Sequence, residues 1–364
     1  MSSSIVRQRV VFFSSQSFVR LWFALLLCAV PLLAQTPGFT SFDAPHAGTL
    51  FNTGTSVAKI NASGMIAGYY IDESGWKSHG FIRKPDGTFT EFDVPGLYSV
   101  TVTSMNNIGQ VVGWGGHVSG NGSWAQGFLR FANGKVVPIH VSGAVSTSPT
   151  AINDGGVVAG SYFDSKGDHG FVRDAQGNYT LFDDPEVVTG REERGTFVTG
   201  IQSNGTVVGY YTGKTGTGHG YVRDEFGNFT NFDAPDAGNG FLIGTFPRAI
   251  NELGEVTGSY VDIMGEPHGF VRDAQGTLTE FDPPDADDSS AFSSNNFGKT
   301  VGLWGGSQGS GGGFVRDSSG AVTTFSVPLR NTGTYPFDIN DAGQITGSWV
   351  DAGQRAWHGF VQVN

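Results

Sequence analysis

Histidine and aspartate recur together along this chain, and both residue types can bind metal ions or transfer protons. The histidine precedes a Gly and an aromatic residue at matched positions: His79, His169, His219, His268 and His358. Aspartates precede four of them: Asp72, Asp164, Asp262 and Asp351. One histidine and one aspartate per copy are too few ligands for a closed zinc site. We therefore expect no metal, and we expect a His–Asp or His–backbone hydrogen bond that holds each hairpin together.

An arginine recurs two residues after the aromatic residue of the same motif. Its copies are Arg83, Arg130, Arg173, Arg223, Arg272 and Arg316. A residue repeated in nearly every copy is a poor candidate for catalysis, because an active site is normally single. We expect these arginines to form ion pairs or stacking contacts between neighbouring copies. Candidate acidic partners for the ion pairs also recur: Asp93, Asp183, Asp233 and Asp282.

Tryptophans are candidates for ligand binding because they stand where the copies differ. Aromatic faces can stack on sugar rings while neighbouring polar groups bind the hydroxyls. The alternative, which is favoured for any single tryptophan, is that the indole anchors a Gly-rich loop. The candidates are Trp76, Trp114, Trp124, Trp304 and Trp357. All but Trp114 would lie in one continuous sector of consecutive copies, which favours a platform for polysaccharide.

One variable connection contributes further candidates for ligand binding. Arg191 and Arg194 flank Glu192 and Glu193, the only obvious carboxylate pair outside the repeated positions. Neighbouring carboxylates on a loop seldom converge on one pocket, so the pair is a weak candidate for acid–base catalysis. No catalytic residue can be assigned from the sequence.

A second variable connection is acidic and contains Asp285, Asp287 and Asp288. Carboxylate oxygens are the ligands that Ca²⁺ prefers, so a calcium ion could bind there. The spacing matches neither an EF-hand nor a glycine-aspartate repeat. A solvated loop is the favoured interpretation, and no cofactor is expected.

The elements that would position these residues come from a repeat of 44 to 49 residues. Each copy contains a turn of the form Ile-Asn-x-x-Gly, followed by Val-Val-x-Gly, by His-Gly-Phe-Val-Arg and by Phe-Thr-x-Phe-Asp. The turn residues are Asn61, Asn106, Asn153, Gln202, Asn251, Asn295 and Asn340. Asn followed at three residues by Gly suits a hairpin turn, in which Asn bonds its own backbone and Gly takes the left-handed conformation. Repeats of this length are typical of solenoids and propellers.

Four strands per copy, without helical periodicity, predict an all-β protein. Adjacent apolar residues such as Val157 and Val158 require both sheet faces to be covered, which favours a propeller over an open solenoid. The last copy lacks its fourth strand, and residues 39–45 match that strand as it appears at residues 229–235. We therefore predict a seven-bladed β-propeller of four-stranded antiparallel blades, closed by the N-terminal strand, which completes the last blade.

These motifs resemble the HAF-repeat family of extracellular proteins, whose copies read Ile-Asn-x-x-Gly-x-Val-Val-Gly and then His-Ala-Phe. The resemblance covers nearly the whole chain after its first residues. Two copies depart from it, with Gln126 and Gly312 in place of the histidine. The family implies an exported repeat protein, but it supplies no activity and no catalytic residues.

The first residues predict a secretory signal peptide over 1–34, because Arg7, Arg9 and Arg20 precede an apolar run that ends at Ala34. A membrane anchor is the alternative, but the run is short for a bilayer. Residues 35–364 would form a single propeller domain without a disulfide, since cleavage removes the only cysteine, Cys28. The formal net charge of −12 argues against a nucleic-acid partner.

The function expected from these features is a secreted binding module, extracellular or periplasmic and monomeric, that takes polysaccharide on its tryptophans. A glycoside hydrolase or polysaccharide lyase, and an extracellular protein–protein scaffold, are the alternatives. A propeller can serve all of these functions, so the fold alone does not choose between them.

Overall fold

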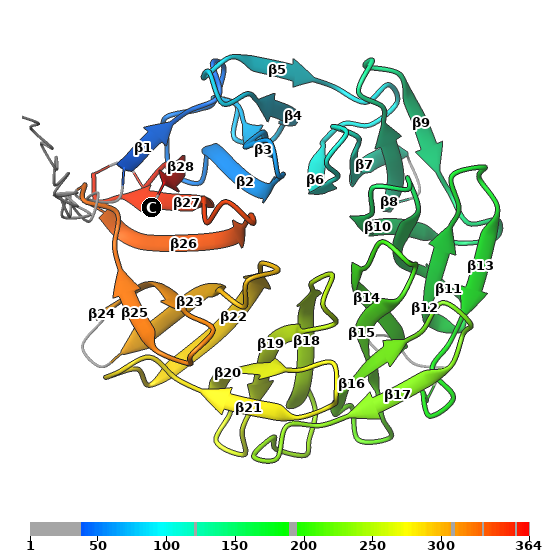
Figure 1. Cartoon of the computed structure of the whole chain (residues 1–364). Coiled ribbons are helices and arrows are strands. Elements are labelled where there is room, and N and C mark those ends of the chain that lie inside the picture. Colours follow the sequence, from blue (N-terminus) through cyan, green and yellow to red (C-terminus); the bar gives the residue numbers. More distant parts are fainter. Residues whose placement is uncertain are drawn as a thin grey trace, which may run out of the picture. The chain divides into compact units, whose positions relative to one another are not determined.

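The computed structural model describes residues 38–119, 122–188, 195–306, 310–329, 331–353 and 355–363. Within these residues the chain forms strands and turns and no helix. The strands pair as antiparallel four-stranded units that follow one another along the sequence. Figure 1 shows these units side by side around a common centre, with the first strand of each unit innermost.

The strand bounds follow the repeat. The innermost strands are β2 (Gly54–Ile60), β6 (Thr101–Met105), β10 (Ser146–Ile152), β14 (Thr196–Ile201), β18 (Gly244–Ile250), β22 (Asp288–Ser294) and β26 (Asn331–Ile339). The second strands are β3 (Ile66–Ile71), β7 (Val111–Ser119), β11 (Val158–Asp164), β15 (Val207–Thr212), β19 (Val256–Val261), β23 (Thr300–Gly306) and β27 (Ile345–Asp351).

The third strands carry the histidine and arginine motif. They are β4 (Ser78–Arg83), β8 (Gly122–Arg130), β12 (Gly167–Arg173), β16 (Gly218–Arg223), β20 (Pro267–Arg272), β24 (Ser310–Arg316) and β28 (Trp357–Val363). The outer strands are β5 (Phe89–Phe92), β9 (Val136–Ile139), β13 (Tyr179–Phe182), β17 (Phe229–Phe232), β21 (Leu278–Phe281) and β25 (Val322–Phe325). The remaining strand, β1 (Gly38–Phe42), pairs antiparallel with β28, and Phe42 lies opposite Gly359.

Two pairs of neighbouring units are joined into eight-stranded sheets by single parallel residue pairs. Gly218 of β16 pairs with Gly244 of β18, and Gly54 of β2 pairs with Trp357 of β28. Both Gly244 and Gly54 have positive φ, and a Cβ on either would lie within 2.1 Å of the facing backbone. Only glycine allows this close approach.

The core lies between the units because both faces of each sheet are covered. The aromatic residue of each third strand is fully buried there: Phe81, Phe128, Phe171, Tyr221, Phe270, Phe314 and Phe360. Apolar residues of neighbouring units pack in common clusters, for example Ala67 of β3 with Val102 of β6. Full burial of one aromatic side chain contributes about 1.5–3 kcal/mol, so the repeated contact between units carries much of the stability.

Candidate functional site

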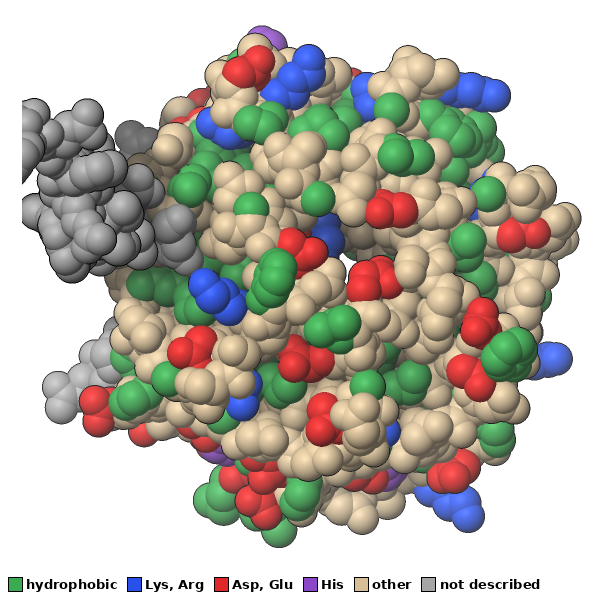
Figure 2. Space-filling model, in the orientation of Figure 1, with side chains coloured by type: hydrophobic (Ala, Val, Ile, Leu, Met, Phe, Trp, Pro, Cys, Tyr) green, Lys and Arg blue, Asp and Glu red, His purple; other side chains and the backbone are tan. Residues whose placement is uncertain are grey.

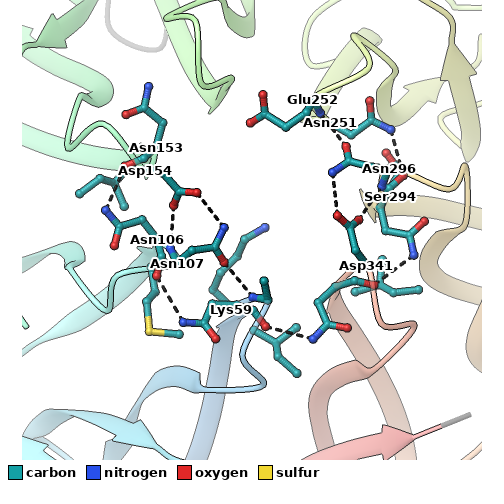
Figure 3. A pocket seen from close by; sticks show the side chains of 18 of the residues that line it. Lys59, Asn106, Asn107, Asn153, Asp154, Asn251, Glu252, Ser294, Asn296 and Asp341 are labelled. Carbon is teal, nitrogen blue, oxygen red and sulfur yellow. Dashed lines mark hydrogen bonds between the residues drawn. The ribbon is translucent and has the colours of Figure 1, made fainter.

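The inner turns of successive units are connected by side-chain amides. Each turn Asn or Gln donates a hydrogen bond to the backbone carbonyl of the next turn residue, at 2.7 to 3.4 Å. Figure 3 shows part of this series. The series runs through Asn61, Asn106, Asn153, Gln202, Asn251, Asn295 and Asn340, and Asn340 donates to Asn61. The turns therefore form one hydrogen-bonded rim at this end of the centre.

Asparagine suits these turns because its amide does two things at once. In Asn251 the Nδ2 group reaches the next unit, while Oδ1 accepts from the backbone nitrogens of Leu253 and Glu255 at 3.0 Å. Gln202 is longer and departs from the pattern: its Nε2 reaches Asn251 O at 2.7 Å, and Asn204 Oδ1 instead accepts from Thr206 N. The predicted asparagine turns are thus confirmed. The same side chains also make a contact to the next unit that the sequence did not reveal.

A cavity of about 190 Å³ lies behind this rim and is lined by the inner strands. Each inner strand has a β-bulge at the residue three positions before the turn Asn. A bulge re-aims a side chain, and all of these residues line the cavity. They are Ala58, Thr103, Thr150, Thr199, Arg248, Phe292 and Phe337. The repeat symmetry is broken here, because three neighbouring threonines contrast with an arginine and two phenylalanines.

The threonine part of the cavity wall presents oxygen lone pairs. Thr103 Oγ1 donates to Pro149 O at 2.9 Å, and Thr150 and Thr199 donate to carbonyls of the second strands at 3.3 Å. Because the hydroxyl hydrogens are used in this way, the oxygens remain as hydrogen-bond acceptors. This part of the wall can accept hydrogen bonds from a ligand.

Another part of the cavity wall, on the inner strand β18 next to β14, carries one exposed cation. Arg248 is exposed, and its guanidinium carbon lies 5.8 Å from the ring centre of Phe292. No carboxylate forms an ion pair with it within the part of the chain that the structure describes. Phe292 and Phe337 pack with ring centres 5.9 Å apart. The arginine can therefore bind an anionic group beside an apolar surface.

The second cation of the cavity, Lys59, is already paired. Its Nζ donates to Asp338 Oδ1 at 2.8 Å. Asp338 is 1% exposed, and it also accepts from Ser293 Oγ and from the backbone nitrogen of Ile60. A buried carboxylate with this set of donors is a structural group, and Lys59 supplies its counter-charge. Lys59 is visible near the rim in Figure 3.

An aromatic cluster lies further along the same strands. Tyr210 stacks on Phe197 at 4.7 Å and contacts the edge of Phe246 at 5.2 Å. Burial raises the pKa of the Tyr210 hydroxyl, and Arg248 opposes that shift by its charge. Burial also raises the pKa of Asp168, on β12, to about 6. Figure 2 shows a hollow near the centre of the displayed face, with a basic side chain visible in it.

The five histidines hold their hairpins by the expected kind of hydrogen bond, but mainly to a different carboxylate. Nδ1 of each contacts an aspartate after the outer strand, and the partners are Asp93, Asp183, Asp233, Asp282 and Asp43 at 2.7 to 3.0 Å. Of the aspartates expected from the sequence, only Asp164 lies within hydrogen-bond distance, 3.1 Å from His169 Nε2. Each ring also packs on an aromatic residue of the second strand, for example Tyr70 on His79.

The recurrent arginines stack, and the ion pairs proposed for them are absent from the described residues. The aspartates suggested as partners bind the histidines instead. The guanidinium of Arg272 lies 4.8 Å from the ring centre of Phe232 in the preceding unit, and Arg223 lies 4.6 Å from Phe182. Arg83 lies over Phe42 of β1 at 4.7 Å. Such cation–π contacts contribute about 0.5–2 kcal/mol each.

The tryptophan candidates do not share one environment. Trp76 is 80% exposed on the turn between β3 and β4. Trp114, Trp304 and Trp357 lie within β7, β23 and β28 and are half-buried, and Trp357 packs on Tyr335 at 5.2 Å. The side chain of Trp124 lies outside the described residues. Three of the four described rings therefore pack into strands, as the loop-anchor alternative favours.

The remaining candidates give no site. Residues 191–194, with Arg191, Arg194, Glu192 and Glu193, lie outside the described part of the chain. No group of three or more histidine, cysteine or acidic side chains among the described residues could hold a metal ion, and this includes Asp285, Asp287 and Asp288. No helix of the described residues is long and apolar enough to cross a membrane.

Sequence reasoning missed the cavity-lining residues although a signal was present. An alignment of the copies at the position three before the turn Asn shows Thr, Thr and Thr followed by Arg, Phe and Phe.

The fold resembles the propellers of several solved hydrolases. Pyrococcus horikoshii acylaminoacyl peptidase matches with a TM-score of 0.53 at 10% identity, over 84% of this chain and 51% of that one. A prolyl endopeptidase matches with a TM-score of 0.57 at 13% identity, over 83% of this chain and 47% of that one. A mutant of puromycin hydrolase matches with a TM-score of 0.50 at 12% identity, over 86% and 52%. The chain thus spans about half the length of these proteins.

No family model matches the sequence, and no curated protein matches it. At the identities given above, the structural likeness shows the fold alone. The expectation of carbohydrate binding is corrected accordingly, because the neighbours are mainly β-propeller domains of peptidases and give it no support. The half-buried tryptophans agree with this correction, because they cannot present a set of exposed rings to a sugar.

Proposed function

We propose that this chain is a peptide-binding β-propeller whose central cavity receives the carboxylate end of an extended peptide. The observation that carries the proposal is Arg248, an exposed guanidinium beside Phe292 that has no ion-pair partner among the described residues, in a cavity whose wall also offers threonine oxygens. A guanidinium binds a carboxylate with paired hydrogen bonds. The phenylalanines would take an apolar side chain, and the threonines would accept from backbone N–H groups.

The proposed scaffold has seven blades and is closed. Pairing of β1 with β28 supports closure, as does the series of turn amides that leads from Asn61 through every copy and back from Asn340 to Asn61. Contacts between the first and last units support it further: Ser348 Oγ accepts from Val57 N at 3.1 Å. A rigid ring is what a central ligand site requires, because its wall is contributed by all of the inner strands.

The names of the structural neighbours agree with a peptide ligand. They are an acylaminoacyl peptidase and a prolyl endopeptidase, proteins named for acting on peptides. The proposal takes from them only the class of ligand, and it places no hydrolytic chemistry in this chain. Membership of the HAF-repeat proteins and export by residues 1–34 belong to the same proposal and rest on the sequence alone.

Calorimetric titration with short peptides tests this function. The probe is the tripeptide Gly-Gly-Phe with a free carboxylate, and the matched ligand is the same tripeptide with an amidated C-terminus. We expect the free acid to bind wild-type protein at least about 10-fold more tightly than the amide, and Arg248→Gln to abolish the difference; a factor of 10 corresponds to about 1.4 kcal/mol.

The control variant is Lys84→Gln, which removes an exposed cation from an outer turn. It should leave binding of the free acid unchanged. Equal affinity for acid and amide, or equal binding by wild type and Arg248→Gln, would refute the assignment of the carboxylate site. If neither the free acid nor the amide bound at millimolar concentration, the carboxylate site would be refuted as well.

A further inference from the structure

A second cavity, of about 680 Å³, lies at the outer side of the fourth unit, away from the inner strands. It is lined by side chains from β15, β16 and β17, from the connection after β13 and from the turn after β15. The lining residues used below are Glu186, Tyr211, Gly213, His219, Asn231 and Phe232. An equivalent cavity in the first unit, lined by Tyr70, Asp72, His79 and Glu91, measures about 400 Å³.

The larger volume follows from one departure in the repeat. At the end of the second strand, where the first unit has Asp72, the fourth unit has Gly213. A Cβ at Gly213 would lie 2.9 Å from Nε2 of His219. The missing side chain would therefore stand directly against the imidazole. Its absence opens the cavity to this ring nitrogen.

His219 consequently has one nitrogen bound and one open. Nδ1 lies 2.9 Å from Asp233 Oδ2, and the ring stacks on Tyr211 at 5.1 Å. With the Nδ1 hydrogen directed to that carboxylate, Nε2 is a hydrogen-bond acceptor. No hydrogen-bond partner reaches Nε2 from the described residues. In the third unit, by contrast, Asp164 contacts the corresponding nitrogen at 3.1 Å.

Further polar side chains line the same cavity. Glu186 accepts from the hydroxyl of Tyr211 at 3.0 Å, which fixes the position of its carboxylate. Asn231 donates to Asp184 at 3.3 Å, and its Oδ1 is buried without a partner in the described structure. Asp184 is 1% exposed, and it occupies a position at which the other units mostly have an apolar residue. A buried oxygen without a donor costs about 1–3 kcal/mol, so a ligand that supplies the donor is stabilising.

We propose that this cavity binds a small organic cation, an ammonium or guanidinium group on an apolar stem. The acceptors Glu186, His219 Nε2 and Asn231 Oδ1 suit a group that has several N–H donors and a positive charge. Tyr211 and Phe232 supply aromatic walls for the stem and for cation–π attraction. Lys214 is the only lysine or arginine among the described residues of the lining, and it is exposed. This site is separate from the central cavity and does not depend on the peptide proposal.

The test uses benzylammonium as the cation and benzyl alcohol as the neutral ligand of the same shape. Titration of the full-length protein, labelled with ¹⁵N at histidine, should show binding of one benzylammonium and a shift of the His219 Nε2 resonance. Benzyl alcohol should bind at least about 10-fold more weakly. The central-site variant Arg248→Gln should bind benzylammonium like the wild type.

Two variants locate the site. Gly213→Asn fills the space that aspartate occupies in other units without adding charge, and Glu186→Gln removes the charge while leaving an oxygen for Tyr211. Each should weaken benzylammonium binding about 10-fold or more, whereas the matched variant Glu91→Gln in the first unit should not. Circular dichroism and the melting temperature check that the variants are folded. Absence of binding by the wild type, equal binding of the alcohol, or unchanged binding by both variants would overturn the proposal.

Discussion

The side-chain amide of Asn340 donates a hydrogen bond to the backbone carbonyl of Asn61 at 3.0 Å, although 279 residues separate them in the chain. Asn340 also donates to Gln344 Oε1, and its own Oδ1 accepts from Gln344 N. One asparagine therefore folds its own turn and attaches it to another. This arrangement repeats from turn to turn, so a local turn preference also sets how neighbouring units meet.

Replacing Asn340 by aspartate should separate these two contributions. Asn340→Asp retains an acceptor for Gln344 N but loses the donor to Asn61 O, which then faces a carboxylate oxygen. We expect the free energy of unfolding to fall by about 1–3 kcal/mol, measured by urea denaturation. Asn133→Asp is the control, because Asn133 lies in an exposed outer turn where Oδ1 accepts from Lys135 N. A similar loss in both variants would show that the contact between turns contributes nothing.

The contribution of β1 can be measured at Phe42. This side chain is 9% exposed, contacts Phe81 and Phe89, and lies under the guanidinium of Arg83. Phe42→Ala should lower the free energy of unfolding by about 3–5 kcal/mol, as for other core phenylalanines. Phe226→Ala, at a ring that is 82% exposed, should change it by less than about 0.5 kcal/mol. If Phe42→Ala were as mild as the control, β1 would not be an integral part of the fold.

The contact between β28 and the segment after β1 should depend on pH. The hydrogen bond between His358 and Asp43 is the main reason that the pKa of His358 is raised above its usual 6.5, and burial of the ring opposes this shift. A raised histidine pKa stabilises the folded state fully below the unfolded pKa, and this stabilisation is lost as the pH rises through the folded pKa. The difference in unfolding free energy between wild type and Asp43→Asn should therefore be larger at about pH 5.5 than at about pH 8.5. A difference that grows with pH would contradict this assignment.

Asp168 should also make the protein less stable as the pH rises, in contrast to a carboxylate whose pKa is lowered on folding. Burial raises its pKa to about 6, so the folded protein resists ionisation of this carboxyl. The stability of the wild type should fall as the pH rises from about 4 through about 6. Asp168→Asn removes the titrating group, so it should be more stable than wild type at pH 8 and nearly equal at pH 4. Thermal unfolding at the two pH values measures the stability of both proteins. If the substitution changed stability equally at both, Asp168 would not be the source of the pH dependence.

The local features of the repeat were predictable because they depend on neighbours in the chain. Asn61 accepts from Ser63 N and Met65 N, and Gly64 has a φ of 79°, as the turn sequence requires. The similarity of residues 39–45 to an outer strand likewise predicted a strand there, and β1 is that strand. Such features depend on backbone preferences and on a sequence that repeats them many times.

The partners of the repeated charges were less predictable. The recurrence of Arg272 and Asp282 suggested ion pairs or stacking contacts between units; Asp282 binds His268, and Arg272 stacks over Phe232 of the preceding unit. Sequence spacing does not specify which side chain of one unit lies against the next. That choice depends on the packing between sheets and on the cost of burying a guanidinium, which aromatic stacking reduces.

The sequence by itself determined the all-β class, the strand order within a unit and the turn chemistry, because each rests on short-range backbone preferences repeated along the chain. Only the tertiary structure decided which residues line the centre. A bulge in each inner strand turns Arg248 and its counterparts toward a common cavity, against the strict alternation of a regular strand. Those residues are far apart in sequence, and only the packing of the units around one centre brings them together.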